Sequence, residues 1–562
     1  MSKKVAYLFE ARGIQRFLFS TGRLKDMLVG SDLIDYICAE NGLLDHALCS
    51  LGFDSQVKSP RRAGGAFYLI FDNLNDAQRF QSVWRLIMSQ WFPTLEIVDT
   101  ITQDTSVKES IAKGINNLHI ARNRIRITLP NASPITQRCN RTGLAVARNI
   151  YTHDNKKEPI DASTYILRNF DRPANSGSVI SRFVAETNND TKIFFPNNFE
   201  ADAKDNKRFP LNSDSMIGLI HADGNGLGEV LRVLNVACSN ADDDTYIELY
   251  RAFSQGMTQA TITATQNASK SILLPNLAKN NVLPARPLVL GGDDLSVIVR
   301  ADLAIDFTEV FILEFARQSA IELNKLRQIF EQHDIDINVI NNLPTYLTAC
   351  AGIVFIKSSQ PFHQAYELAE SLCKKAKSYS RAHLDLVTDN TIPASLAFYQ
   401  VKDSTLTDID LIIANNLTVN HQDATYHLSL PAYFVDSSKF SEDSGKKLAT
   451  VKQLKELVNF LLNSDFNENF LRSFATTIHD SLPKAKKDYK RWLEFSSKEK
   501  VRVHTIHQKQ QLENITEFHE MLGNMIGELE ESLPFTKTDT TYQSALADIL
   551  TLLKIIKKNT DK

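Results

Sequence analysis

Cysteine is scarce in this sequence, and none of its six cysteines forms a C-x-x-C pair with another. Such isolated thiols fit the reducing cytosol and argue against a disulfide framework. Long apolar runs are also missing, because none approaches the ~20 residues that a membrane-spanning helix needs. The apolar stretch near the first residue is too short for a signal peptide. We therefore expect a cytoplasmic protein that does not enter a membrane.

An excess of either charge is lacking as well. The 63 Lys and Arg residues and the 66 Asp and Glu residues give a formal net charge of −3 at pH 7. A nearly neutral chain has no global attraction to nucleic acid, so RNA binding would need a local basic patch or a partner protein. With 562 residues, 43% of them hydrophobic, the chain is long enough for roughly three or four domains.

What the sequence does contain is an acidic turn between two apolar runs, in residues 286–299. Runs of Val, Ile and Leu flank Gly291, Gly292, Asp293 and Asp294, which predicts a β-hairpin because Gly tolerates positive φ. Adjacent carboxylates at the tip of a hairpin repel one another, and this favours a site for a hard cation such as Mg²⁺. A solvated turn is the alternative, since Gly–Asp pairs are common in turns.

A second candidate lies upstream, where residues 215–222 predict a buried strand. This strand runs into Asp223, Gly224, Asn225 and Gly226, and a helical pattern follows. An Asp that closes a strand can reach a metal held by a neighbouring strand. A Gly-rich turn at the start of a helix offers backbone N–H groups to phosphate oxygens.

The elements after the acidic turn complete a recognisable order. Helical periodicity covers residues 303–330, a strand follows at 346–355, and a helix runs from 361 through 377. The order is β, α, β-hairpin, α, β, α, with one Asp closing the first strand and two on the hairpin. This order is the palm arrangement used for two-metal nucleotidyl transfer.

These segments resemble the second palm of the large polymerase/cyclase subunit of type III CRISPR effectors, and more distantly diguanylate cyclases. The resemblance rests on Asp223-Gly224-Asn225, Gly291-Gly292-Asp293-Asp294, Ala351-Gly352-Ile353 and Ala376-Lys377. It implies synthesis of cyclic oligoadenylates from ATP with two Mg²⁺ or Mn²⁺ ions. It further implies three catalytic metal ligands, Asp223, Asp293 and Asp294, and a set of residues near the nucleotide: Gly224, Asn225, Gly226, Gly291, Gly292 and Lys377. A solvated helix end is the alternative interpretation of Lys377.

The N-terminal part repeats the same order of elements, which indicates an internal duplication. In this first copy, Ala66 and Phe67 stand where Asp293 and Asp294 stand in the second, so we expect a degenerate palm that binds no metal. Gly13-Ile14-Gln15 resembles the start of the same CRISPR subunit just after its His-Asp nuclease domain. The resemblance therefore implies a short form without that nuclease, and the three His-Asp dipeptides of the chain lack companion histidines.

The remaining segments are less regular. Residues 131–214 are rich in Asn, Asp, Pro and Lys and predict a linker with a small subdomain. Within it, Cys139-Asn140-Arg141-Thr142-Gly143 resembles a fragment of a zinc knuckle, which we expect to be metal-free because one cysteine cannot supply about four ligands. From residue 441 onward apolar stripes at helical spacing predict a helical C-terminal domain. Basic residues at 484–491 and 498–509 either face RNA or a protein partner or form a solvated surface.

The prediction is an α+β fold with two ferredoxin-like palms, the first degenerate and the second active, and a helical C-terminal domain. The expected boundaries are 1–130, 131–214, 215–400 and 401–562. The expected function is synthesis of cyclic or linear oligoadenylates in antiviral defence, with RNA and other subunits of a type III CRISPR-like complex, or a standalone defence partner. The alternatives are a diguanylate-type cyclase or polymerase, and a non-catalytic scaffold of an RNA-guided complex.

Overall fold

The computed structural model describes residues 3–53, 56–124, 132–143, 145–153, 156–171, 178–185, 192–199, 208–212, 214–239, 241–389, 391–402, 408–438, 440, 447–464, 466, 468–498 and 506–557. Two compact units make up the chain. The first comprises Met1–Phe209, Gly226–Val297 and Glu314–Leu347, and the second comprises Pro210–Asn225, Ile298–Leu313 and Thr348–Lys562. The four domain boundaries expected from the sequence stay predictions.

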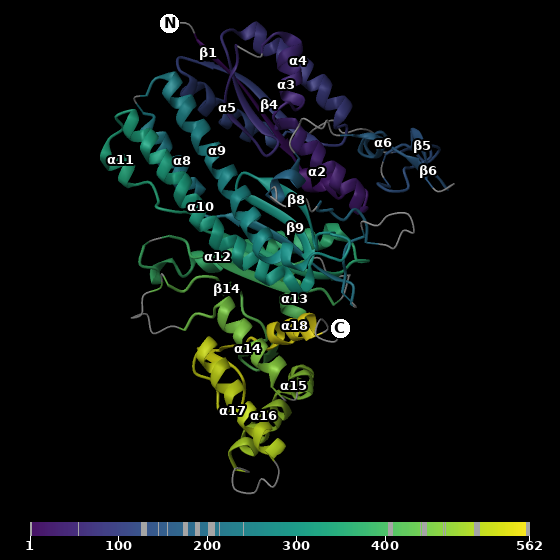
Figure 1. Ribbon diagram of the computed structural model, residues 1–562, viewed down its shortest axis with the longest axis vertical. Helices are drawn as coiled ribbons and strands as arrows, with labels where there is room; N and C mark the ends of the chain where they lie inside the picture. The colour runs from purple at the N-terminus through teal and green to yellow at the C-terminus, as the bar shows by residue number, and fades with distance from the viewer. Residues whose placement is uncertain are drawn as a thin grey trace. The chain divides into compact units, whose positions relative to one another are not determined.

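The first sheet contains four antiparallel strands in the order β2-β3-β1-β4. The strands are β1 (Lys4–Arg12), β2 (Lys58–Ala63), β3 (Ala66–Phe71) and β4 (Glu96–Asp104). Helices α1 (Ile14–Leu18), α2 (Leu24–Cys38) and α3 (Leu43–Leu51) follow β1, while α4 (Leu74–Trp91) and α5 (Val107–Arg122) follow β3 and β4 (Figure 1). All six residues of β3 are buried, as expected for an unbroken apolar run covered on both faces. This is the ferredoxin-like order of strands.

The second sheet repeats that order and extends it. Strands β7 (Met216–Gly224), β8 (Ala285–Gly291), β9 (Asp294–Arg300) and β10 (Ala349–Lys357) run in the order β10-β7-β9-β8. Strand β11 (Ser395–Gln400) adds to β10 in parallel, and β14 (Tyr433–Phe434) pairs with β11. The predicted α+β duplication is confirmed, and β11 and β14 extend the second sheet beyond the four strands of the palm.

Helices α8 (Leu227–Ala237), α9 (Asp243–Ala268), α10 (Ala304–Gln332), α11 (Ile337–Asn341) and α12 (Phe362–Arg381) belong to the second palm. The side chain of Asp242 caps α9 by accepting a hydrogen bond from the Thr245 N–H, which satisfies one of the free donors at the start of the helix. Apolar residues of α9 form a buried stripe that includes Leu249, Phe253 and Met257. This stripe is core packing.

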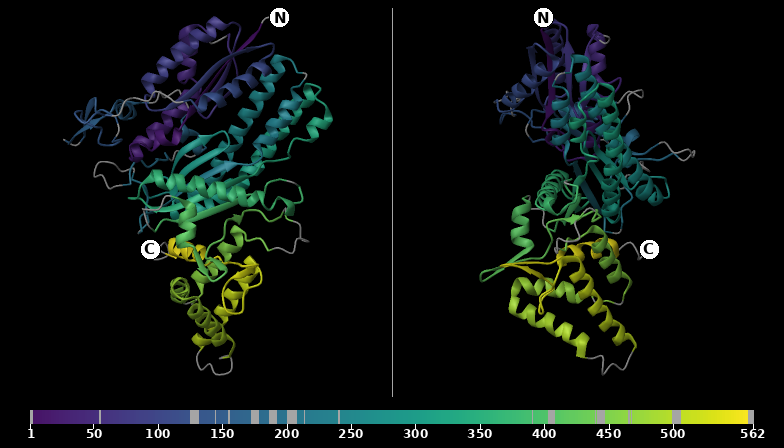
Figure 2. Two further views of the ribbon diagram at one scale, coloured as in Figure 1. Left: turned by 180° about the vertical axis from the view of Figure 1, so that it is seen from behind. Right: turned by 90° about the vertical axis from the view of Figure 1, so that its left-hand side faces the viewer.

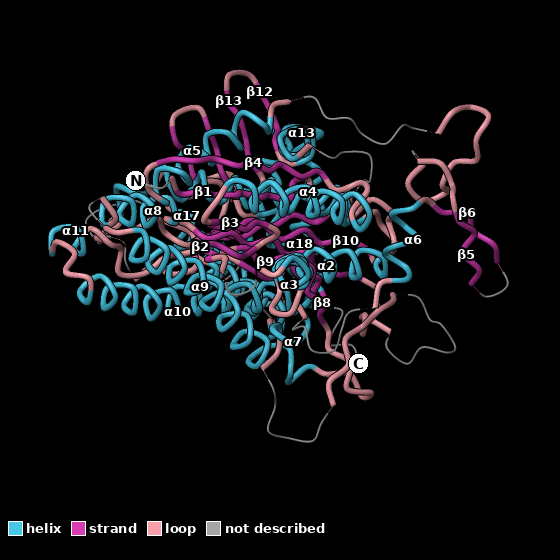
Figure 3. The backbone as a smooth tube through the Cα atoms, turned by 90° about the horizontal axis from the view of Figure 1, so that it is seen from above, coloured by secondary structure: helices cyan, strands magenta, loops and turns pink. Residues whose placement is uncertain are grey.

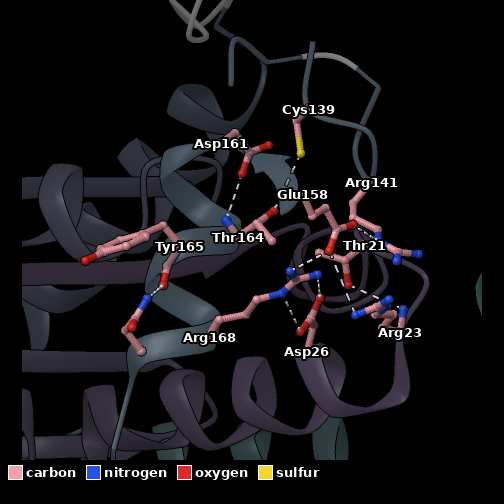
Figure 4. A network of polar contacts seen from close by, with 11 residues as sticks. Thr21, Arg23, Asp26, Cys139, Arg141, Glu158, Asp161, Thr164, Tyr165 and Arg168 are labelled. Atoms are coloured by element: carbon pink, nitrogen blue, oxygen red, sulfur yellow. Dashed lines mark hydrogen bonds and ion pairs between the residues drawn. The ribbon is translucent and has the colours of Figure 1, made fainter. Parts of the chain in front are cut away.

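A small subdomain follows the first palm and contains β5 (Asn149–His153), β6 (Lys156–Ile160), α6 (Ala162–Asn169) and α7 (Val179–Phe183). The β5–β6 ladder projects from its unit (Figure 3). The side chain of Arg168 is 4% exposed, and its guanidinium forms ion pairs with Asp26 of α2 and with Glu158 (Figure 4). This buried network attaches the subdomain to the first palm, because separating the partners would leave buried charges unpaired.

The segment that resembles a zinc knuckle lies in the same subdomain. Cys139 is fully buried, and its Sγ lies 4.0 Å from Thr164 Oγ1. Among the residues that the structure describes, no cluster of three potential metal ligands includes this thiol. Parts of the expected linker, at residues 131, 172–177, 186–191 and 200–207, lie outside the described residues.

The C-terminal part is mainly helical, as predicted, with α13 (Ile409–Asn416), α14 (Val451–Asn463), α15 (Glu468–Asp480), α16 (Leu482–Lys498), α17 (Ile506–Ile526) and α18 (Leu546–Lys557) (Figure 2). A small sheet accompanies them in the order β12 (Thr418–His421), β13 (Ala424–His427), β16 (Thr541–Gln543) and β15 (Thr536–Thr538). The sequence pattern missed β15 and β16, because three residues are too few for a clear alternation. The side chains of the basic stretch at 498–509 lie outside the described residues, and so do residues 441–446 at the expected start of the helical domain.

No helix among the described segments combines the length and the apolar character that crossing a bilayer requires.

Candidate metal and nucleotide site

Three acidic side chains gather at one edge of the second palm sheet. Asp223 is the penultimate residue of β7, Asp293 lies in the turn after β8, and Asp294 begins β9. One carboxylate oxygen from each lies within 4.8 Å of the others, and all three residues are partly exposed. Strands β7 and β9 are neighbours in the sheet, so their ends meet although about 70 residues separate them in sequence. Within the described ranges, no other group of His, Cys, Asp or Glu meets this criterion.

The acidic turn is tight. Gly292 has φ of 65°, a left-handed conformation that a residue with a Cβ adopts only at a cost. A Cβ at Gly291 or Gly292 would meet no atom within 4 Å, so backbone conformation and not lack of space favours glycine at Gly292. The hairpin and its acidic tip lie where the sequence predicts them.

Lys377 is the cation beside these acids. Its ammonium forms an ion pair with Asp223 and donates a 2.8 Å hydrogen bond to the Gly224 carbonyl oxygen. The side chain of Lys377 is only 16% exposed, which excludes the alternative of a fully solvated helix end. The pairing places one positive charge against a cluster whose formal charge is −3 when all three acids are ionised.

Gly352 explains how α12 brings Lys377 to this position. A Cβ at Gly352 in β10 would lie 2.0 Å from the Ala369 carbonyl oxygen and 2.6 Å from the Cys373 nitrogen, both in α12. Glycine therefore lets the backbone of the helix approach the backbone of the strand. The same strand pairs Cys350 with Asp223 of β7, so the close approach of α12 sets the distance between Lys377 and the end of β7.

Hydrogen bonds of a buried asparagine stabilise the turn after β7. Asn225 is 3% exposed, and its backbone N–H donates to the Thr348 carbonyl oxygen at 2.7 Å. Its side-chain amide also donates to Thr348 Oγ1 at 3.0 Å. Gly226, with φ of 85°, is the N-cap of α8. These contacts brace the loop that carries Asp223, while the nucleotide-binding roles of Gly224, Asn225 and Gly226 stay predictions.

Sequence reasoning overlooked His221. It precedes Asp223 by two positions on β7, and residues two apart in a strand lie on the same face of the sheet. Its side chain is 7% exposed, with Nδ1 at 3.3 Å from the Tyr366 hydroxyl. Burial lowers the pKa of His221, and the nearby Asp223 carboxylate opposes that shift. A neutral imidazole therefore lies behind the acidic cluster at pH 7, and the period of two could have revealed it.

The chain resembles several solved structures of Csm1. Csm1 in T. onnurineus has 12% sequence identity and a TM-score of 0.43, with 99% of this chain and 70% of that chain covered. A Csm1–Csm4 cassette in complex with AMPPNP has 12% identity and a TM-score of 0.46 over the same shares. A cassette in complex with cA4 has 13% identity and a TM-score of 0.39, and the match covers 67% of this chain and 53% of that one. No family model and no curated protein sequence matches the chain.

At the corresponding edge of the first palm, the described residues include no cluster of three potential metal ligands. Its turn consists of Gly64 and Gly65, and β3 begins at Ala66. Strand β9 begins at Asp294, just as β3 begins at Ala66. When the two turns are aligned on these strand starts, Gly65 corresponds to Asp293 and Ala66 to Asp294. The sequence comparison had placed both correspondences one residue later, at Ala66 and Phe67. Glu10 of β1 pairs in register with Ala66 and forms a 2.5 Å ion pair with Arg122.

Proposed function

We propose that this protein is a two-metal nucleotidyltransferase that joins ATP into cyclic or linear oligoadenylates in antiviral defence. The observation that carries the proposal is the group of three carboxylates within 4.8 Å on the second palm sheet. The resemblance of these residues to the second palm of type III CRISPR polymerase/cyclase subunits supplies the substrate class. The degenerate first palm supports catalysis in the second, because one copy keeps the acids that the other lacks.

The donor set fits hard divalent cations. Carboxylate oxygens are the ligands that Mg²⁺ and Mn²⁺ prefer, and a divalent cation would reduce the repulsion between three neighbouring carboxylates. Asp223, Asp293 and Asp294 would hold the two ions. When bound, such ions polarise the attacking 3′-hydroxyl and stabilise the leaving pyrophosphate.

The remaining work of the chain is positioning and charge neutralisation. Gly226 caps α8 without a side-chain hydrogen bond, so the N–H groups of the first two helical residues, Leu227 and Gly228, would be available to phosphate oxygens. A Cβ at Gly228 would meet nothing within 4 Å, so this first turn is open. Lys377 forms an ion pair with Asp223 and would turn to the triphosphate once cations share that carboxylate.

The proposed setting is cytoplasmic, with RNA and other subunits of a type III CRISPR-like complex or a standalone defence protein as partners. Helix α16 supports a polyanionic partner, because Lys484, Lys487 and Lys490 are exposed and form no ion pair among the described residues. Exposed lysines on one helix supply the positive charge that phosphate groups bind.

Two other functions use the same fold. A diguanylate-type cyclase or a polymerase would employ the same three acids and differ in the base that it selects. A scaffold subunit would keep the palm for its shape alone, which leaves the retained acidic cluster unexplained.

The test is to incubate the purified protein with each NTP in turn, with Mg²⁺ or Mn²⁺ and with its native partners present, and to measure product masses. We expect oligoadenylates from ATP. A guanylate dinucleotide from GTP would favour the diguanylate reading, template-dependent incorporation of all four nucleotides would favour a polymerase, and no product from any NTP would favour the scaffold.

A further inference from the structure

Helix α9 contacts the acidic turn through one buried side chain. Thr261 is fully buried, and its Oγ1 donates to the Gly292 carbonyl oxygen at 2.7 Å. The same hydroxyl lies 3.1 Å from the Met257 carbonyl oxygen of its own helix, the bond that a helical threonine normally makes. A hydroxyl has one proton to donate, and the shorter contact is the one to the turn.

This bond acts on the acid that follows Gly292. The carbonyl oxygen of Gly292 belongs to the peptide unit whose nitrogen is that of Asp293, and a peptide unit is planar. Holding the oxygen therefore fixes the direction in which the chain enters Asp293. A Cβ at Gly292 would contact nothing within 4 Å, so the turn is loosely packed at this position. The hydrogen bond from Thr261 is therefore important for holding the turn in place.

The anchoring helix is itself fixed to the first palm. The Val107 N–H donates to the Asp243 carboxylate at 2.7 Å, and Arg251 Nε donates to the Ser59 carbonyl oxygen at 3.0 Å. These two contacts attach the N-terminal half of α9 to α5 and β2. The C-terminal half carries Thr261, so one rigid helix of 26 residues links the palm without acids to the acidic turn.

We infer that Thr261 is a positioning residue that sets the geometry of the Asp293 and Asp294 carboxylates and thereby the affinity of the site for divalent cations. The inference rests on the proposed function. It also assigns a role to the first palm, which holds the helix that anchors the metal ligands of the second.

The test compares Mn²⁺ binding by the full-length wild type and its variants, measured as loss of the free Mn²⁺ signal in electron paramagnetic resonance. Thr261→Val removes the donor and keeps the shape of the side chain, and Thr261→Ser restores the hydroxyl. Thr265→Val is the matched control, because Thr265 is equally buried on the same helix but donates to the Thr261 carbonyl oxygen at 2.8 Å. Asp293→Ala with Asp294→Ala gives the background level of binding.

We expect Thr261→Val to weaken Mn²⁺ binding about fivefold, as loss of one hydrogen bond that orients the ligands would do. Thr261→Ser and Thr265→Val should bind like the wild type. Equal binding by Thr261→Val and the wild type would overturn the positioning role alone, and so would an equal loss in Thr265→Val. If the wild type binds no more Mn²⁺ than the variant without acids, the metal site and the proposed function fail as well. Should Thr261→Val not fold by circular dichroism, Thr261→Ala removes the same donor and takes its place.

Discussion

At the tip of the β8–β9 hairpin, Asp293 and Asp294 carry like charges close to Asp223. The acids are partly exposed and bury little apolar surface, so the fold depends little on them. Their cost is mutual repulsion, which Lys377 relieves only in part by pairing with Asp223. A group of residues that costs stability and is nevertheless present indicates a function.

Replacing both Asp293 and Asp294 by Ala should abolish product formation from ATP, with a loss on the order of a thousandfold or more, because such ions stabilise both the attacking and the leaving oxygens. Pyrophosphate release measures the activity, and circular dichroism verifies the fold. Glu10→Gln is the control, since it removes a carboxylate at the equivalent edge of the first palm and should leave turnover nearly unchanged. Wild-type turnover by the double variant would reduce the hairpin to a simple turn.

Asp548 of α18 is a buried acid far in sequence from this site. Its Oδ2 accepts hydrogen bonds from the Tyr433 hydroxyl at 2.6 Å and from the Leu430 N–H at 3.0 Å. Burial raises the pKa of Asp548 to about 7, and both hydrogen bonds oppose that rise. The ordinary pKa of Asp in an unfolded chain is about 3.9. At pH values between about 3.9 and about 7, Asp548 is therefore protonated in the folded protein and ionised in the unfolded chain.

The contribution of Asp548 to the free energy of unfolding is consequently greatest below about pH 4, and it is lost as the pH rises through about 7. We predict that Asp548→Asn, which can still accept both hydrogen bonds but carries no charge, gains melting temperature relative to the wild type as the pH rises from 5 to 8. Thermal unfolding at both pH values measures the difference. A difference that does not change with pH would show that the carboxyl is ionised throughout this range.

Among the elements, α12 and β10 show how a single residue sets the distance between a helix and a strand. Gly352 has no room for a Cβ because the Ala369 carbonyl oxygen and the Cys373 nitrogen lie in its place. Both obstructing atoms are backbone, so the helix as a whole would have to move. The position of Lys377 beside Asp223 depends on that contact.

We predict that Gly352→Ala lowers the free energy of unfolding by about 3 kcal/mol or more, in the upper range for overpacked cores. Where the variant folds, activity should fall further than stability explains, because Lys377 moves with the helix. Denaturant unfolding and pyrophosphate release measure the two effects. Gly523→Ala in α17 is the control, since a Cβ there meets only the Leu529 side chain, at 3.7 Å or more.

At the scale of the whole molecule, two palms share one strand order and differ in the residues of their turns. The first palm keeps the sheet order and replaces the acidic turn with Gly64 and Gly65. The second keeps the acids and adds β11 and β14 to the sheet. Divergence has therefore acted on the turn and the sheet edge, while the buried strands preserve the common fold.

Cation binding should be visible in the stability of the whole protein. Without divalent cations, we predict that Asp293→Ala with Asp294→Ala melts at or slightly above the wild-type temperature, because repulsion is relieved. With Mn²⁺ at about 100 times its dissociation constant, the wild type should gain about 2.7 kcal/mol and the variant should not. Melting curves with Mn²⁺ and with EDTA measure this reversal, and equal shifts in both proteins would place the bound ion elsewhere.

The sequence by itself determined the α+β class, the duplicated order of elements and the acidic hairpin, because apolar periodicity and Gly-rich turns are local signals. It also placed Asp223 at the end of a strand. Tertiary structure decided the rest: the pairing of β7 with β9 that gathers three acids, the approach of α12 that brings Lys377, and the anchoring of Gly292 by Thr261. These contacts join residues that lie 31 to 154 positions apart in sequence. Local sequence patterns cannot predict them, because the packing of distant elements determines which residues meet.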